Sequence, residues 1–133
     1  MIGGRVFDSS GLVAFGVGSP YAQAAVWSSV EENLVIVVPA PALVAALAQI
    51  PDDRWDIITA LLNLPITVIT DLTRGTAPGI ADTLRAAAGN HAPAGVTAAA
   101  VVHAARDRGW PVLTSQPQPL RALWPRVPVE PLP

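Results

Sequence analysis

Cysteine is absent from the 133-residue sequence, and so is lysine, because all eight basic residues are arginine. The lack of cysteine excludes disulfide bonds, thiolate zinc sites and cysteine nucleophiles. The arginines are scattered along the chain, and ten acidic residues give a formal net charge of −2. The clustered basic footprint that is typical of nucleic-acid-binding proteins is therefore missing.

Charge of either sign is scarce, since charged residues make up 14% of the chain and hydrophobic residues 51%. So little charge predicts that part of the surface is covered by a partner, either as a homodimer or as a complex with another protein. The predicted helices Tyr21–Glu32 and Pro41–Ile50 are the candidates for a dimer contact. The apolar runs Leu34–Leu47 and Ile57–Ile69 are interrupted by proline and too short to span a bilayer. With no signal-peptide pattern at the start, a cytoplasmic location is expected.

Strands and helices alternate along the whole chain, which predicts a parallel sheet in a three-layer α/β/α sandwich of about five strands and a single domain over residues 1–133. The predicted strands are Val6–Asp8, Leu34–Val38, Pro65–Ile69, Trp110–Thr114 and Val127–Glu130. Both Leu34–Val38 and Pro65–Ile69 are rich in β-branched residues and are expected to be buried. Prolines place Val127–Glu130 at an edge, and Val6–Asp8 is expected between Leu34–Val38 and Val112–Thr114.

Periodicity also predicts the inner faces of the helices. The helix Tyr21–Glu32, capped by Ser19, is expected to place Ala24, Trp27 and Val30 on one face. The next helix points Leu43, Val44 and Leu47 inward. A further helix, capped by Asp52 or Asp53, carries Trp55, Ile58 and Leu62 on a shared face, and the four tryptophans are interpreted as core or interface anchors.

Polar side chains follow two of the strands that are expected to be neighbours. Asp8 ends the first strand and leads into a helix that Ser9 or Ser10 is expected to cap, and Thr114 and Ser115 end the fourth strand. The carboxyl ends of parallel strands meet at one rim, where open α/β sheets bind ligands. Two interpretations of Asp8 follow: it is a catalytic carboxylate, or it accepts backbone N–H bonds at the head of the helix.

Three features follow one another along the chain. They are a hydrophobic strand followed by Asp8 and two serines, a proline directly after the second strand at Val38-Pro39, and an Ala-rich helix, glycine, strand and threonine over Ala98–Thr114. In this ordered set of features the sequence resembles the PIN domain, the fold of ribonuclease toxins in many prokaryotic toxin–antitoxin pairs. The resemblance implies a PIN-like, bacterial protein. It also implies a small DNA-binding, antitoxin-like protein as partner.

The acidic site that the resemblance implies is depleted in this chain. An active PIN domain places about four carboxylates around Mg²⁺, which requires hard oxygen ligands. Asp8 matches the first of them, but Pro39–Gln49 and Asn90–Ala105 contain no acid, and Gln116 stands where the fourth is expected. The predicted remnant pocket consists of Asp8, Ser10, Thr114, Ser115 and Gln116, with Asp8 as a weak metal ligand at most and no cofactor.

Two functions remain open from the sequence. The first is a non-catalytic PIN-like module that binds a protein partner. The alternative is a Mg²⁺-dependent endoribonuclease toxin that acts on RNA, with Asp71, Asp82 and Asp107 as its only reserve acids. His91 and His103 lie twelve residues apart, too far for a metal-binding pair on one helix, and are interpreted as surface or satisfied residues.

Overall fold

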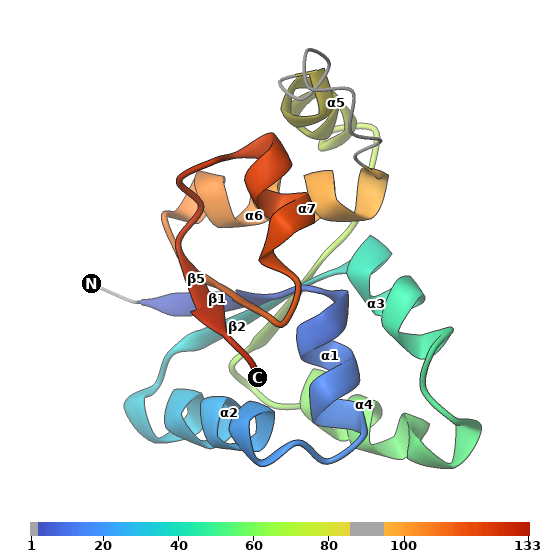
Figure 1. The fold of residues 1–133 in the computed structure, drawn as a ribbon. Coiled ribbons are helices and arrows are strands. Elements are labelled where there is room, and N and C mark those ends of the chain that lie inside the picture. Colours follow the sequence, from blue (N-terminus) through green and yellow to red (C-terminus); the bar gives the residue numbers. More distant parts are fainter. Residues whose placement is uncertain (1–2, 86–94) are drawn as a thin grey trace.

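The computed structural model describes residues 3–85 and 95–133, and its centre is a five-stranded parallel sheet (Figure 1). The strand order is β3-β2-β1-β4-β5, and every neighbouring pair is parallel. The strands are β1 (Gly4–Phe7), β2 (Val35–Pro39), β3 (Thr67–Thr70), β4 (Val112–Thr114) and β5 (Val129–Pro131). The predicted α/β class, the place of the first strand between the second and fourth, and the edge position of the last strand are confirmed.

Helices cover both faces of the sheet, which confirms the predicted three layers (Figure 1). α1 (Ser9–Gly16), α2 (Pro20–Glu32) and α4 (Trp55–Leu62) lie on one side, and α6 (Val96–Arg108) and α7 (Pro117–Leu123) lie on the other. The remaining helices are α3 (Ala40–Leu47), the short 3-10 turn η1 (Asp52–Arg54) and α5 (Ala77–Arg85). Among the described residues, no helix is both long enough and apolar enough to cross a membrane.

The core is centred on β1 and β2, where Phe7, Ile36 and Val37 are fully buried. The expectation that the third strand is buried as well was wrong, because Val68 is 44% exposed and Ile69 is 42% exposed. β3 has a neighbour on one side only, so its β-branched residues do not receive the cover that β2 receives.

The inner face of α2 also differs from the prediction. Trp27 is 65% exposed and Val30 is 40% exposed, and the buried residues are instead Ala22, Val26 and Ser29. Ser29 tolerates burial because its hydroxyl donates to the carbonyl of Ala25 at 2.8 Å.

Two further helices need the same kind of correction. In α3 the side chain of Val44 is 69% exposed, and Ala42 and Ala46 are buried in its place, which lets α3 lie close to both α1 and α6. Trp55 is 42% exposed, and no side chain caps the turn at Asp52. The predicted cap of α2 is confirmed, because Ser19 accepts a bond from the Ala22 N–H.

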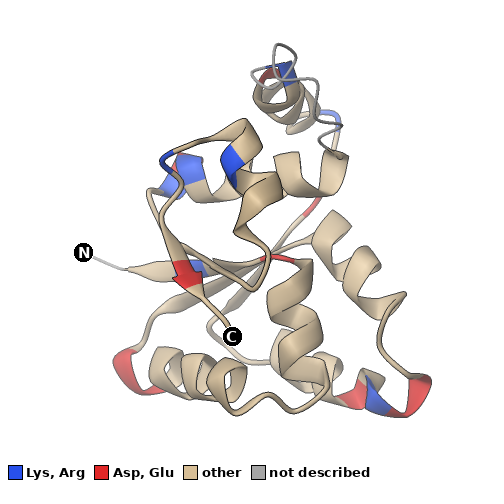
Figure 2. Ribbon diagram, in the orientation of Figure 1, with Lys and Arg blue, Asp and Glu red and all other residues tan. Residues whose placement is uncertain are grey.

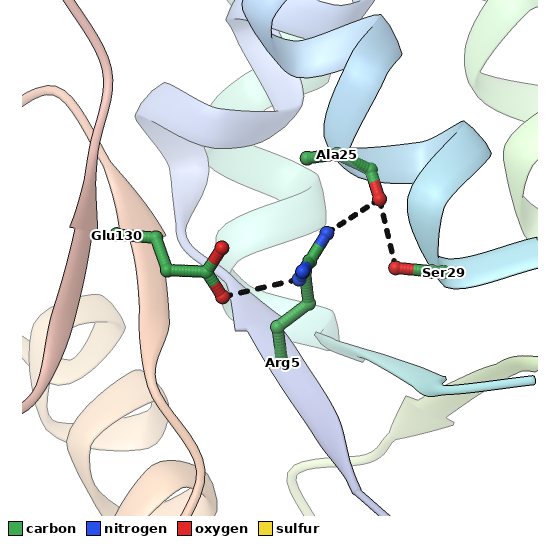
Figure 3. Close-up of polar contacts among 4 residues, drawn as sticks. All are labelled: Arg5, Ala25, Ser29 and Glu130. Carbon is green, nitrogen blue, oxygen red and sulfur yellow. Dashed lines mark hydrogen bonds and ion pairs between the residues drawn. The ribbon is translucent and has the colours of Figure 1, made fainter. Parts of the chain in front are cut away.

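One largely buried arginine ties three elements together. Arg5 of β1 has Nε 3.1 Å from a carboxylate oxygen of Glu130 in β5, and its Nη1 donates to the carbonyl of Ala25 in α2 (Figure 3). The Nε contact is an ion pair that lacks hydrogen-bond geometry. Because the Arg5 side chain is only 11% exposed, this pairing keeps its charge from standing alone in the interior and holds β5 at the sheet edge.

Candidate functional site

Asp8 caps α1. It follows β1 in an extended conformation, and its Oδ1 accepts a hydrogen bond from the Gly11 N–H at 2.8 Å. This bond satisfies one of the backbone donors that the first turn of a helix leaves without a partner. The prediction that Ser9 or Ser10 forms the cap was wrong, because the helix begins at Ser9, one residue after the carboxylate.

Ser10 joins the ends of β1 and β4. Its hydroxyl donates to Asp8 Oδ1 at 2.6 Å, accepts from the Ser115 N–H at 2.9 Å and lies 3.2 Å from Thr114 Oγ1. The same Thr114 oxygen accepts from the Gln116 N–H at 2.9 Å. We call Asp8, Ser10 and Thr114 the hydroxyl clasp. The structure thus brings all five residues of the predicted remnant pocket together at one rim of the sheet.

Burial dominates the electrostatics of the clasp. The Asp8 side chain is 7% exposed, and its desolvation raises the pKa of the carboxyl above its ordinary value. Hydrogen bonds from the hydroxyls of Ser10 and Thr114 and from the Gly11 amide lower the pKa but do not offset the burial. The carboxylate is therefore engaged by donors of the protein itself, and a cation would have to compete with them.

Among the residues that the structure describes, Asp8 shares its hollow with no second carboxylate. All ten acids of the chain fall within the described residues, and no three of the His, Asp and Glu residues there are placed to hold a metal ion. A hollow of about 200 Å³ next to Asp8 is lined by no second carboxylate. Its other lining residues are Ser9, Gly95, Thr97, Ala98, Val101, Gln116, Pro119 and Leu120.

The reserve acids lie elsewhere. Asp71 and Asp107 line a separate hollow of about 120 Å³ together with His103, between the end of β3 and α6. Asp82 is exposed on α5 and pairs with Arg85 at 3.6 Å. His91 lies outside the described residues. Asp71, Asp82 and Asp107 are therefore all absent from the lining of the hollow next to Asp8.

A larger hollow, of about 330 Å³, opens on the other side of Gln116. It is lined by Ser9, Ser10 and Ser115, and also by Ser19 and Gln49, which sequence reasoning did not assign to the site. Ser19 comes from the start of α2 and Gln49 from the residues after α3. The positions of Ser19 and Gln49 in the sequence do not predict that they line the same hollow. Their proximity results from how α1 packs on the neighbouring helices.

No protein-family model matches the sequence, and no curated protein matches it. Solved structures do match the fold. One of them is VapBC2 from Rickettsia felis, bound to a DNA fragment from its promoter. It matches with a TM-score of 0.72 at 12% identity, over 98% of each chain. The fold is PIN-like.

Two more solved structures share the PIN-like fold. FitAcB from Neisseria gonorrhoeae gives a TM-score of 0.62 at 13% identity, covering 94% of this chain and 95% of that one. FitAB bound to an IR36 DNA fragment gives a TM-score of 0.62 at 13% identity, and the match covers 96% of this chain and 94% of that one. Identities this low establish the PIN-like fold alone, so the activity has to be argued from the residues of this chain.

Proposed function

We propose that this PIN-like protein acts by binding a protein partner and does not hydrolyse RNA with metal ions. The observation that carries the proposal is the use of Asp8, whose Oδ1 already accepts from Gly11 and Ser10 in a hollow without a second carboxylate. Mg²⁺ gives up its water reluctantly and is held in two-metal nuclease sites by several anionic oxygens. One buried, hydrogen-bonded carboxylate does not replace them.

An apolar groove between α2 and α4 supports a partner-binding role. The groove has a volume of about 290 Å³. Phe15, Gln23, Val26, Trp27, Val30, Ala60, Leu61 and Leu64 line it. Trp27, 65% exposed, lies at this groove. Exposed tryptophans beside apolar grooves are the kind of residue that dominates binding energy in protein interfaces.

Acidic residues gather at both ends of this helical layer (Figure 2). Glu31 and Glu32 end α2, and Asp52, Asp53 and Asp56 lie at the start of α4, with Arg54 as the one basic residue among them. Arg54 donates to the carbonyl of Gly16. An apolar groove with acidic ends is complementary to an amphipathic helix that carries an apolar face and basic flanks.

The partner that we propose is a small DNA-binding, antitoxin-like protein that supplies such a helix. The sequence resemblance implies this partner, and two of the similar solved structures contain DNA, VapBC2 with promoter DNA and FitAB with an IR36 fragment. Because such a partner would bind DNA, we propose a cytoplasmic location for the complex.

Partner binding is tested by co-purification from the native host with a matched pair of variants. Trp27→Ala removes the exposed side chain of the groove, and Val44→Ala removes an equally exposed apolar side chain on α3. We expect a DNA-binding protein to be retained by the wild type and by Val44→Ala and lost with Trp27→Ala. Equal retention by both variants would place the partner elsewhere on the molecule.

The absence of metal chemistry is tested by thermal unfolding with and without Mg²⁺ or Mn²⁺. A site with a Kd of about 0.1 mM in about 10 mM metal would stabilise the fold by roughly 2.7 kcal/mol, which raises Tm by several degrees. We expect an unchanged Tm and no RNA cleavage. A metal-dependent shift that Asp8→Asn abolishes, together with metal-dependent cleavage, would establish the endoribonuclease alternative instead.

A further inference from the structure

The 330 Å³ hollow lined by Ser9 and Ser10, the two residues after Asp8, lies at the topological switch point of the sheet. From β1 the chain moves outward to β2 and β3, and it then returns to the other side of β1 to form β4 and β5. The loops after β1 and β4 therefore diverge and leave a crevice at their carboxyl ends, the place where open α/β sheets bind ligands. Ser9 and Ser10 begin α1 directly after β1 and Asp8, and Ser115 and Gln116 follow β4, so the segments after both strands contribute side chains to it.

The side chains that line this crevice are partly polar but carry no charge. Among the residues that the structure describes, no Asp, Glu, Arg, Lys or His lines the 330 Å³ hollow, whose polar residues are serines and glutamines. Apolar contact is available from Val13 and Leu132. Phosphate groups are usually held by arginine, lysine or clustered backbone N–H groups. A lining without cationic side chains favours a neutral ligand over a phosphorylated one.

The lining groups also have unused hydrogen-bonding capacity. Within residues 3–85 and 95–133, the side chains of Ser9, Ser115 and Gln116 form no hydrogen bond with the protein, and Gln49 uses only its Nε2, toward Ala45. Ser10 is different, because its hydroxyl is fully engaged in the clasp. The crevice thus offers serine hydroxyls and glutamine amides, which both donate and accept, next to the clasp that joins the ends of β1 and β4.

We propose that this crevice binds an uncharged, hydroxyl-rich ring, either a free monosaccharide or the ribose of a nucleoside. The hydroxyls of such a ring match the serines and glutamines, and its C–H face matches Val13 and Leu132. The volume of about 330 Å³ falls at the lower end of the range of small-molecule sites, which suits a ligand of this size. This binding is separate from the α2–α4 groove and does not depend on a protein partner.

Amide resonances of the full chain, followed by NMR while ligand is added, test the proposal. D-ribose, D-glucose, uridine and uridine 5′-monophosphate are the probes. We expect saturable shifts at Ser9, Ser10, Ser115 and Gln116 with a neutral probe, and weaker binding of the monophosphate than of uridine. Equal affinities for ribose and uridine would identify a sugar site, and tighter binding of uridine would identify a nucleoside site.

Two variants locate the ligand. Gln116→Ala is expected to lower the affinity for the neutral probe about tenfold, as the loss of a hydrogen bond does. Gln23→Ala, which removes the same amide from the α2–α4 groove, is expected to change nothing. The same spectra report whether each variant is folded. The proposal is overturned if no neutral probe gives saturable shifts, if the monophosphate binds more tightly than uridine, or if Gln116→Ala binds like the wild type.

Discussion

At the scale of single residues, Asp8 has a structural task at the start of α1. It caps α1, and through Ser10 it connects that cap to the end of β4. A carboxylate near a helix N-terminus is also favoured by the helix dipole. Burial opposes these stabilising contributions, because Asp8 is only 7% exposed and its ionised carboxylate loses hydration there.

The raised pKa of Asp8 makes a pH-dependent prediction with a definite sign. A folded-state pKa above the unfolded value means that the folded protein binds the proton more tightly. At neutral pH, ionised Asp8 therefore lowers the free energy of unfolding. This loss of stability disappears as the pH falls through the pKa of the folded state toward that of the unfolded state. The substitution Asp8→Asn would keep a side-chain acceptor for the Gly11 N–H without the charge. We expect this variant to be at least as stable as the wild type at pH 7, and to lose that advantage toward about pH 4.

Urea unfolding at a series of pH values measures this difference, and two variants serve as references. Asp8→Ala removes the cap itself and is expected to cost about 1–2 kcal/mol. Asp82→Asn alters an exposed carboxylate that pairs with Arg85 at the surface, where such pairs contribute little, so its stability should follow that of the wild type. An advantage of Asp8→Asn that grows as the pH falls would contradict the burial argument.

At the scale of elements, the position of α1 against β4 determines whether the clasp can form. Gly11, in the first turn of α1, allows this approach, because a Cβ there would lie 2.7 Å from the backbone carbonyl oxygen of Leu113. Backbone cannot rotate away as a side chain can. The two elements would have to separate, and with them Ser10 and Ser115.

Gly11→Ala is therefore expected to destabilise the protein by about 1–3 kcal/mol, the usual cost of overpacking, although alanine is the better helix former. Gly75→Ala is the matched control, because the nearest atom to a Cβ at that position is 3.7 Å away, and its effect should be within about 0.5 kcal/mol. Thermal or urea unfolding of the two variants makes the comparison. Equal effects would show that α1 has room to move.

The elements themselves could be predicted from the sequence, but not all of their faces. Alternating β-branched runs and helical stretches predict a parallel sheet. Because the carboxyl ends of parallel strands meet at one rim, Asp8, Thr114 and Ser115 could be predicted to lie together. In α2 apolar residues occupy more than one face, so periodicity did not distinguish Val26, which is buried, from Trp27, which is exposed. The central role of Ser10 also escaped, because it depends on side-chain direction after packing.

At the scale of the whole molecule, the α2–α4 groove is not the only place where exposed apolar residues lie. Besides the α2–α4 groove, Val44 of α3 is 69% exposed and Leu72 is 51% exposed, and both line a second hollow. If the groove is reserved for a partner, the Val44 surface is the candidate for the homodimer that the sequence predicts.

Light scattering of the isolated chain should then give about twice the 13.8 kDa of one copy. Val44→Asp places a charge in the proposed contact and is expected to yield monomers, because a charge buried without a partner is costly. Trp27→Ala is expected to leave the dimer intact. A wild type that stays monomeric at high concentration, or a dimer that only Trp27→Ala disrupts, would reject this assignment.

The distribution of charge makes the last prediction, which concerns how a partner helix reaches the groove. Acids at both ends of the α2–α4 layer attract a basic helix from a distance, and such steering is screened by salt with a Debye length of about 10 Å at 0.1 M (Figure 2). Association of an amphipathic peptide with Arg flanks should therefore slow as salt rises, and Asp52→Asn/Asp53→Asn should reduce that salt dependence. Trp27→Ala should instead speed dissociation, because buried aromatic contacts determine how long a complex lasts. Surface plasmon resonance separates the two rates, and the same peptide with Glu flanks is the control. A salt-independent association rate, or equal binding of both peptides, would show that the acidic ends do not select the partner.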